Sequence, residues 1–116
     1  MRRDILALLE DIREAAAFIA DDTAGLTFTA FEQDRRSRQL VERNFEIIGE
    51  AVNRLRRHDP DLAERISAYR RIIGFRNELI HGYDAIDYPT VWRAVQESLP
   101  VLRAEVEALL REAEEQ

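Results

Sequence analysis

Apolar residues at helical spacing begin close to the N-terminus of the chain. Between residues 4 and 20 they recur every three or four positions, which places them on one face of an α-helix. The apolar residues of this face are Ile5, Leu8, Leu9, Ile12, Ala16 and Ile19. Asp4 can cap the start of this helix, because its carboxylate can accept a hydrogen bond from a free backbone N–H. The polar segment 21–25, which ends in Gly25, predicts the end of the helix.

A second, longer helical pattern covers residues 29–57. Its apolar stripe consists of Leu40, Phe45, Ile48, Val52 and Leu55, with Val41, Ile47 and Ala51 beside it. The segment from Thr29 to Glu32 fits a capping box, so the helix is expected to begin at Thr29. Gly49 inside the helix costs about 1 kcal/mol relative to alanine. It either allows close approach of another backbone or a ligand, or it is simply tolerated.

Two further principal helices follow, at residues 67–81 and from Asp87 onward. A proline ends the second helix, and a short extra helical turn is expected near residues 61–66. Asp87 can cap the fourth helix, whereas Pro100 should kink it near Gln96, four residues earlier. The fourth helix carries a seam with the 3–4–3–4–3 spacing of helix packing, formed by Trp92, Val95, Leu99, Leu102, Val106 and Leu109.

These patterns predict an all-α fold without strands or internal repeats. Residues 1–116 are expected to form a single domain, an up-down bundle of four principal helices. The chain can close one core, and its modest length means that oligomerisation would help to bury more surface.

The composition narrows the class of protein. The 116 residues include no cysteine and only two histidines, so we expect no disulfide framework, no metal site and no cofactor. No apolar run is long enough to cross a bilayer. The basic start of the chain leads into an amphipathic helix and not into the apolar core of a signal peptide, so we expect a cytoplasmic location.

The charge distribution is more informative than the net charge of −6. All 17 basic residues are arginine. Residues 35–76 contain 11 arginines and 6 acidic residues, a net charge of +5, whereas the rest of the chain carries −11. A basic middle can face a polyanion, because a guanidinium binds two phosphate oxygens at once. An ordinary solvated helix face explains the same distribution.

Most of the candidate catalytic residues lie in the segment 75–84, near the end of the third helix. They are Arg76, His81 and Tyr83. Gly82 stands where a left-handed C-terminal cap belongs. Histidine moves protons near neutral pH and arginine stabilises anions, a combination that suits phosphoryl chemistry. In a continuous helix Arg76 and His81 point about 140° apart. They can meet only if the helix loosens before Gly82 or if two subunits each contribute, so we expect a composite site at a dimer interface.

Arg76 and Tyr83 share the apolar arc of the third helix, the face that should be buried. A buried arginine is costly without a partner, since its charge loses solvation. Arg76 can therefore pair with a carboxylate across the bundle, such as Glu46 or Glu50. Alternatively, this face lines a cleft or a subunit interface.

The sequence resembles the HEPN superfamily of ribonucleases. The pattern Arg-x-x-x-x-His-x-Tyr, formed by Arg76, His81 and Tyr83, resembles that of the HepT-like toxins of HEPN–MNT toxin–antitoxin systems. Segments 43–51 and 72–92 are similar to the second, third and fourth helices of that branch. The resemblance covers nearly the whole chain and implies a compact helical domain that forms a homodimer.

The resemblance also implies a metal-independent endoribonuclease site in the dimer cleft. The 2′-hydroxyl of RNA would attack the adjacent phosphate, while His81 moves protons and Arg76 stabilises the charge on phosphorus. Asn77 would orient His81 from one turn away. The implied partner is a minimal nucleotidyltransferase antitoxin that transfers AMP to Tyr83 and so blocks the cleft. Tyr83 can alternatively be an interface aromatic residue with a hydrogen-bonded hydroxyl.

Arg43, Arg70 and Arg71 are candidates for RNA contact, although Arg43 can instead form an ion pair with Glu46 or Glu50. A different class of function stays open. The same dimer can serve as a non-catalytic nucleotide- or RNA-binding partner of the nucleotidyltransferase, which the acidic net charge favours. A purely structural helical bundle is the third possibility.

Overall fold

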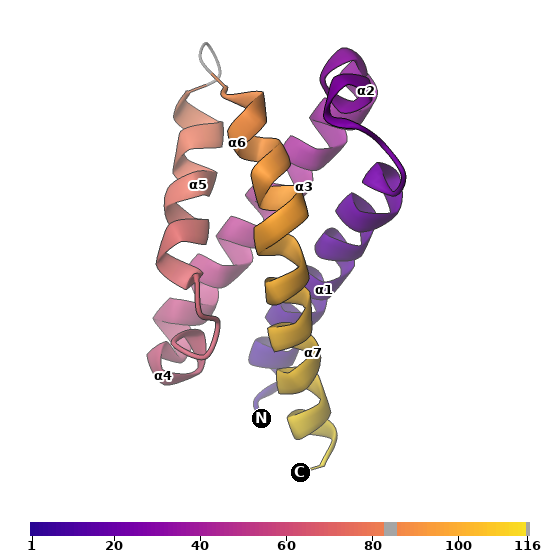
Figure 1. The fold of residues 1–116 in the computed structure, drawn as a ribbon. Coiled ribbons are helices and arrows are strands. Elements are labelled where there is room, and N and C mark those ends of the chain that lie inside the picture. Colours follow the sequence, from indigo (N-terminus) through magenta and orange to yellow (C-terminus); the bar gives the residue numbers. More distant parts are fainter. Residues whose placement is uncertain (83–85, 116) are drawn as a thin grey trace.

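The computed structural model describes residues 1–82 and 86–115, and these residues form helices joined by short connections (Figure 1). In chain order the elements are α1 (Arg3–Thr23), α2 (Phe28–Gln33), α3 (Arg35–His58), α4 (Pro60–Ala63), α5 (Tyr69–His81), α6 (Tyr88–Arg93), the π-helical segment η1 (Ala94–Ser98) and α7 (Leu99–Glu114). The expected all-α bundle is confirmed. Its four principal helices are α1, α3, α5 and the continuous rod α6–η1–α7, and α4 is the short extra turn.

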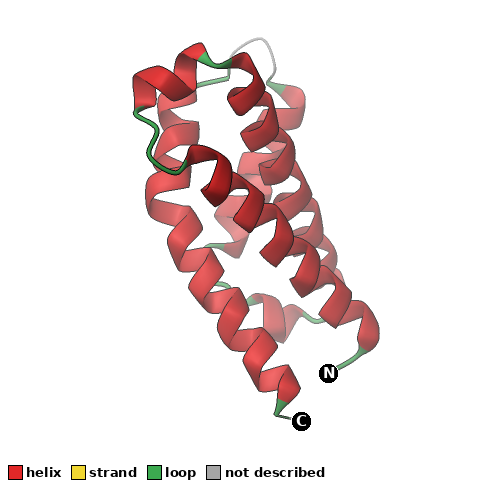
Figure 2. Ribbon diagram, turned by 90° about the vertical axis from the view of Figure 1, so that its right-hand side faces the viewer, coloured by secondary structure: helices red, strands yellow, loops and turns green. Residues whose placement is uncertain are grey.

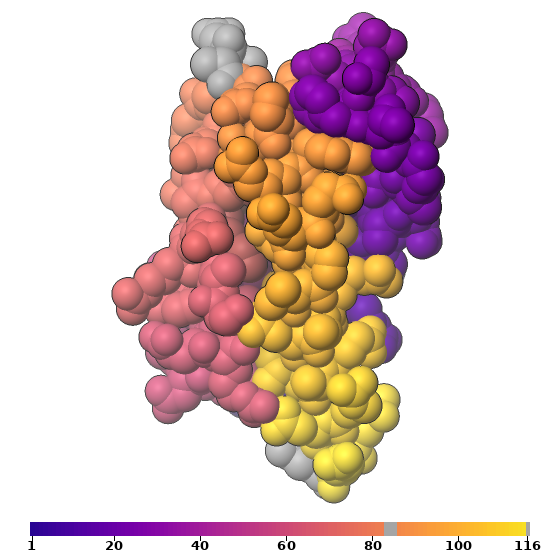
Figure 3. Space-filling view, in the orientation of Figure 1, coloured from indigo at the N-terminus to yellow at the C-terminus, as the bar shows by residue number. Residues whose placement is uncertain are grey.

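α3 is the central helix of the bundle. α1 and α5 each pack along α3, and α7 packs against α1. The molecule is elongated, 45 × 29 × 19 Å, and its long helices run roughly along one axis (Figure 2). In the space-filling view α7 forms a ridge between the α1 side and the α5 side (Figure 3). Because α5 is held mainly by α3, the chemistry expected on α5 is positioned by the contact between these two helices.

The predicted apolar faces form the core. The face of α1 is buried, and so is the seam of the fourth helix, apart from the half-buried Trp92. Burying one large aliphatic side chain stabilises the fold by roughly 1.5–3 kcal/mol. The fully enclosed large side chains come from most helices and include Ile5, Leu9, Ile12, Ile19, Phe31, Ile48, Leu55, Val91 and Leu109. None of the described helices combines the length and the apolar character needed to cross a membrane.

The predicted start of the second helix at Thr29 is wrong, because two helices occupy this region. α2 begins after Thr27, whose hydroxyl accepts a hydrogen bond from the N–H of Ala30 at 3.1 Å. α2 ends before Asp34, whose carboxylate accepts a hydrogen bond from the N–H of Ser37 at 3.2 Å and caps α3. Aspartate and threonine side chains offer the backbone such local bonds, which favour helix starts over helix interiors. Thr29 therefore lies inside α2.

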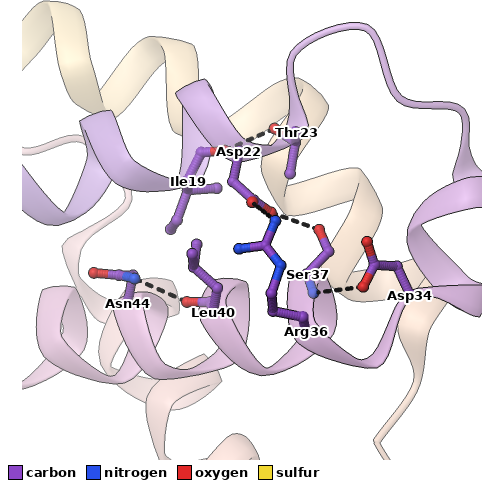
Figure 4. Close-up of polar contacts among 8 residues, drawn as sticks. All are labelled: Ile19, Asp22, Thr23, Asp34, Arg36, Ser37, Leu40 and Asn44. Carbon is purple, nitrogen blue, oxygen red and sulfur yellow. Dashed lines mark hydrogen bonds and ion pairs between the residues drawn. The ribbon is translucent and has the colours of Figure 1, made fainter.

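Asp22 joins the end of α1 to the start of α3 (Figure 4). Its carboxylate accepts hydrogen bonds from the hydroxyl of Ser37 at 2.6 Å and from Nη2 of Arg36 at 3.3 Å. The side chain of Asp22 is only 10% exposed and Ser37 is buried, so these bonds pair groups that would be costly to bury alone. After α1 the chain turns toward α2 at Gly25, whose φ of 78° favours glycine.

Two other helix starts differ in detail from the prediction. α1 begins at Arg3, and the carboxylate of Asp4 accepts a hydrogen bond from the N–H of Ile5 at 2.9 Å, so Asp4 lies in the first turn and is not the cap. α6 begins directly after Asp87, as expected, but the Asp87 carboxylate accepts its hydrogen bond from the hydroxyl of Thr90 at 2.8 Å and not from a backbone N–H.

Pro100 has the predicted effect on the fourth helix. Proline lacks the N–H that would bond to the carbonyl of Gln96, and its ring crowds that carbonyl. The rod widens at this point into η1, a π-helical turn that contains Gln96. Such wide turns are one of the ways in which a helix accommodates a break in its hydrogen-bond ladder.

Candidate active site

α5 is a regular helix up to its last residue, His81. Leu79 anchors it in the core, and the N–H of Gly82 donates to the carbonyl of Glu78 at 2.7 Å. The predicted left-handed cap at Gly82 is wrong, because its φ is −109°. The helix therefore does not loosen before Gly82. Tyr83, the predicted modification site, lies outside the described residues.

α3 and α5 approach each other most closely at Gly49. A Cβ atom built on Gly49 would lie 2.3 Å from the Cβ of Arg76 and 2.9 and 3.1 Å from its Cγ and Cδ. Side-chain carbons do not approach so closely, so only glycine leaves room for the Arg76 stem to cross α3. Gly49 does allow a close approach, but the approaching group is the side chain of Arg76 and not the expected backbone or ligand.

The guanidinium of Arg76 is held by polar groups on both helices. Its Nη2 lies 2.9 Å from Oε2 of Glu50, and its Nη1 donates to Oδ1 of Asn77 at 3.3 Å. Nε is buried without a hydrogen-bond partner in the described structure. The expected ion pair between Arg76 and Glu50 is confirmed. Because the side chain keeps 25% of its surface exposed and a guanidinium carries five N–H groups, part of its head remains open to an anion.

One copy of the chain does not bring Arg76 and His81 together. His81 is exposed, and among the described residues no hydrogen bond or ion pair joins it to Arg76. Since α5 is helical over both residues, their side chains project about 140° apart. Asn77, expected to orient His81, instead accepts a hydrogen bond from Arg76. The loosened helix end that could bring the pair together within one copy is therefore not present in α5.

A cavity of about 250 Å³ lies beside Arg76, over α3 and between α1 and α5. It has room for several water molecules or one phosphate group. Its charged lining residues are Asp11, Arg43, Glu46, Glu50, Arg54 and Arg76, and its apolar ones are Leu8, Ile47, Ala51 and Ile80. In the part of the chain that the structure describes, no group of three or more His, Cys, Asp or Glu side chains is arranged to hold a metal ion.

Arg43 is the candidate RNA contact that shares this cavity with Arg76. Its Nη1 lies 3.4 Å from Oε2 of Glu46, so the surface ion pair expected for Arg43 is also confirmed. The side chain of Arg43 remains 71% exposed. Arg54 lines the same cavity, although the sequence pattern had not marked it as a candidate RNA contact. It follows Arg43 by 11 residues, or three helical turns, and that spacing could have found it.

Arg70 and Arg71 do not line the cavity that contains Arg76. Nε of Arg70 donates to the hydroxyl of Tyr69 at 2.8 Å, and its Nη2 lies 3.7 Å from Glu64. Arg71 lines a separate groove of about 410 Å³ between α5 and the α6–η1–α7 rod, with an apolar floor that includes Phe45. Neither residue is therefore placed beside the Arg76 head.

Glu42 and Tyr88 form a second polar pair, which joins α3 to α6. The hydroxyl of Tyr88 donates to Oε2 of Glu42 at 3.3 Å, and the Arg38 guanidinium lies 5.4 Å from the centre of the Tyr88 ring. Burial raises the pKa of Glu42, and burial together with the nearby Glu42 charge raises the pKa of Tyr88. Neither residue lines the cavity beside Arg76, so this pair serves the packing of the bundle.

Comparisons with known proteins identify the family. The model of the HepT-like ribonuclease family matches residues 8–109, a stretch that includes the Arg76–His81 pattern. A protein of Methanocaldococcus jannaschii named "Putative RNase MJ1380" is 35% identical over 108 residues, which cover 91% of this chain and 96% of the relative. A protein of Thermococcus cleftensis named "Probable ribonuclease HepT" is 34% identical over 113 residues, with 94% and 98% covered. No solved structure matches the chain significantly. The chain belongs to the HepT-like ribonuclease family.

Proposed function

We propose that this protein is the toxin of a HEPN–MNT toxin–antitoxin pair and cleaves RNA in the cytoplasm as a metal-independent endoribonuclease. The observation that carries this proposal is the setting of Arg76. Its stem crosses Gly49, its head is held by Glu50, and part of the head faces a cavity large enough for a phosphate. An arginine that is largely buried yet keeps open donors is suited to stabilise a developing anion.

The proposed reaction uses the 2′-hydroxyl of RNA as the nucleophile. The 2′-oxygen bonds to the adjacent phosphorus, the bond to the 5′-oxygen breaks, and the products are a 2′,3′-cyclic phosphate and a 5′-hydroxyl. His81 takes the proton from the 2′-hydroxyl, and the imidazolium so formed gives a proton to the leaving 5′-oxygen. Arg76 stabilises the negative charge that builds up on the phosphorane oxygens.

The divergent directions of Arg76 and His81 support a homodimer in which Arg76 of one copy meets His81 of the other. Mixing Arg76→Ala and His81→Ala proteins tests this directly. If the two copies assort freely in a symmetric dimer, half of the dimers are mixed and each has one intact pair, so about a quarter of wild-type activity should return. If each copy uses its own pair, the mixture stays inactive.

The nuclease itself is tested with purified protein, single-stranded RNA and a chelator. We expect cleavage in the chelator, products that end in a cyclic phosphate, and no cleavage of the same sequence with 2′-deoxyribose. His81→Ala and Arg76→Ala should abolish cleavage. Arg103→Ala is the matched control, because Arg103 is exposed and lies outside the proposed site. Equal activity in the three variants would refute the nuclease proposal.

Neutralisation is proposed to occur by AMP transfer to Tyr83. In this step the phenol oxygen of Tyr83 bonds to the α-phosphorus of ATP and pyrophosphate leaves. Intact-mass measurement after co-expression with the partner nucleotidyltransferase should show adducts of AMP mass. They should disappear in Tyr83→Phe and persist in Tyr88→Phe, since the Tyr88 hydroxyl is half-buried against Glu42. Adducts that survive Tyr83→Phe would refute the assignment.

A second candidate function is a non-catalytic nucleotide- or RNA-binding partner of the nucleotidyltransferase. The net charge of −6 favours the nucleotide-binding form of this role, because a long polyanion such as RNA is repelled by an acidic surface more strongly than a mononucleotide is. The same cleavage assay separates the two functions. A dimer that binds RNA but leaves it intact in every buffer would support the binding role.

A further inference from the structure

Three arginines form a row along one side of α3, on both sides of the point where Arg76 crosses it. Arg43, Arg54 and Arg57 fall within about 60° on the helical wheel of α3, so they share a face. Arg43 and Arg54 line the cavity together with Arg76. Nη2 of Arg57 lies 3.9 Å from Oε1 of Glu50, the carboxylate that holds Arg76.

The arginine side chains of this row are more exposed than the carboxylates paired with them. The side chain of Arg43 is 71% exposed, whereas its partner Glu46 is 26% exposed. Arg57 is 60% exposed, against 41% for Glu50, and Arg54 is exposed. The carboxylates keep neighbouring guanidinium groups apart and in place. The exposed Asp11 of α1 also lines the cavity, so Arg43, Arg54, Arg57 and Arg76 lie among three carboxylates and leave one positive charge in excess.

The row leads to a basic end of the molecule. Next to Arg57 are the exposed Arg56 and His58 at the end of α3, and the exposed Arg2 and Arg3 lie at the start of the chain. Nη2 of Arg2 donates to the carbonyl of His58 at 3.4 Å, so these two segments are side by side. Basic residues at the end of α3 also suit its helix dipole, which accounts for Arg56, Arg57 and His58 but not for Arg43, in the first half of the helix.

We propose that this arginine row is the track for the RNA backbone, and that Arg54 and Arg57 contact phosphates on one side of the cleaved bond while Arg43 contacts them on the other. The proposal rests on the proposed function and adds how the substrate is held. From Arg43 to Arg57, α3 rises about 21 Å, the length of about six stacked nucleotides at roughly 3.4 Å each. Contacts with phosphates alone would bind single strands with little dependence on sequence.

The test measures binding separately from cleavage. A fluorescein-labelled 12-nucleotide RNA with 2′-O-methyl groups lacks the nucleophile and stays intact. Its affinity is measured by fluorescence anisotropy at several salt concentrations for wild type, Arg54→Gln/Arg57→Gln, and the control Arg103→Gln/Arg111→Gln. The control removes the same charge from exposed positions on α7. Circular dichroism verifies that all three proteins are folded.

The track predicts weaker binding at low salt and a salt dependence reduced by about 1.4 in the slope of log K against log salt, roughly 0.7 for each lost contact on a single strand. The control should keep the wild-type slope. Equal slopes in the three proteins, or no binding by wild type at low salt, would overturn the track. A lowered slope for Arg54→Gln/Arg57→Gln without any RNA cleavage in the separate assay would refute the nuclease and retain the track. Cleavage of RNA with equal slopes in the three proteins would refute the track and retain the nuclease.

Discussion

Replacing Gly49 by alanine tests the contact that positions Arg76. The new methyl group would lie 2.3 Å from the Cβ of Arg76, and ordinary van der Waals contact begins at 3.4 Å. The clash involves a Cβ fixed to the α5 backbone, so a change of side-chain rotamer cannot relieve it. α5 must move away from α3 by about 1 Å, and this movement loosens the packing around Leu79 and the ion pair with Glu50.

The expected magnitude follows from two opposing effects. Alanine is favoured over glycine in a helix by about 1 kcal/mol, whereas overpacking a well-packed site costs about 1–3 kcal/mol. Gly49→Ala should therefore lower the free energy of unfolding by up to about 2 kcal/mol. Gly74→Ala is the matched control, because a Cβ there meets nothing within 4 Å. It should raise the free energy of unfolding by up to about 1 kcal/mol.

Urea unfolding followed by far-ultraviolet circular dichroism gives both values. A double variant sharpens the result, since Arg76→Ala keeps the Cβ that clashes and Arg76→Gly removes it. Gly49→Ala should thus be less harmful in the Arg76→Gly background than in the Arg76→Ala background. If Gly49→Ala stabilises the protein as much as Gly74→Ala does, the close approach of Arg76 to α3 is refuted.

Three further predictions concern stability. Burial gives Glu42 a higher pKa in the folded state than its ordinary 4.5. The contribution of Glu42 to stability is therefore lost as pH rises through the folded pKa. Between about pH 4 and about pH 7, the free energy of unfolding of Glu42→Gln in urea titrations should rise relative to that of wild type. Asp34→Ala should lower the free energy of unfolding by about 1 kcal/mol, because α3 loses its cap, whereas Thr29→Ala should leave the urea midpoint nearly unchanged. A larger loss of stability in Thr29→Ala than in Asp34→Ala would show that Thr29 is the cap. Phe31→Ala should cost about 3–5 kcal/mol in the same assay, because the ring is fully buried, and a loss below 1 kcal/mol would contradict that burial.

The sequence predicted those features that depend on local pattern. The apolar faces of α1 and of the fourth helix are buried as their spacing predicts, and Pro100 disturbs the helix at Gln96. The wheel placed Arg76 on the buried face, and a buried arginine needs a carboxylate, so Glu50 was a natural partner. In each case a short-range rule and the core agree, which is why the prediction succeeds.

The failures have a different physical origin. Thr29 and Thr27 offer the same hydroxyl two residues apart, and the choice between them depends on how α2 packs through Phe31. A glycine permits a left-handed turn without requiring it, and Gly82 does not adopt one. Arg54 joins Arg76 only because α5 crosses α3 near Gly49. A sequence pattern shows which face is polar, but not which parts of two polar faces meet.

Arg76 combines a structural stem with a candidate catalytic head, and this decides how its variants are interpreted. Arg76→Ala removes the stem that fills the contact with α3 and leaves Glu50 with Arg57 alone, at 3.9 Å, so lost activity can reflect lost stability. Arg76→Lys keeps most of the stem and the positive charge but replaces the planar fork by a single ammonium group. If guanidinium geometry stabilises the phosphorane, Arg76→Lys should unfold within about 1 kcal/mol of wild type in urea while its kcat falls at least tenfold. A lysine variant that cleaves RNA at the wild-type rate would show that a point charge is enough.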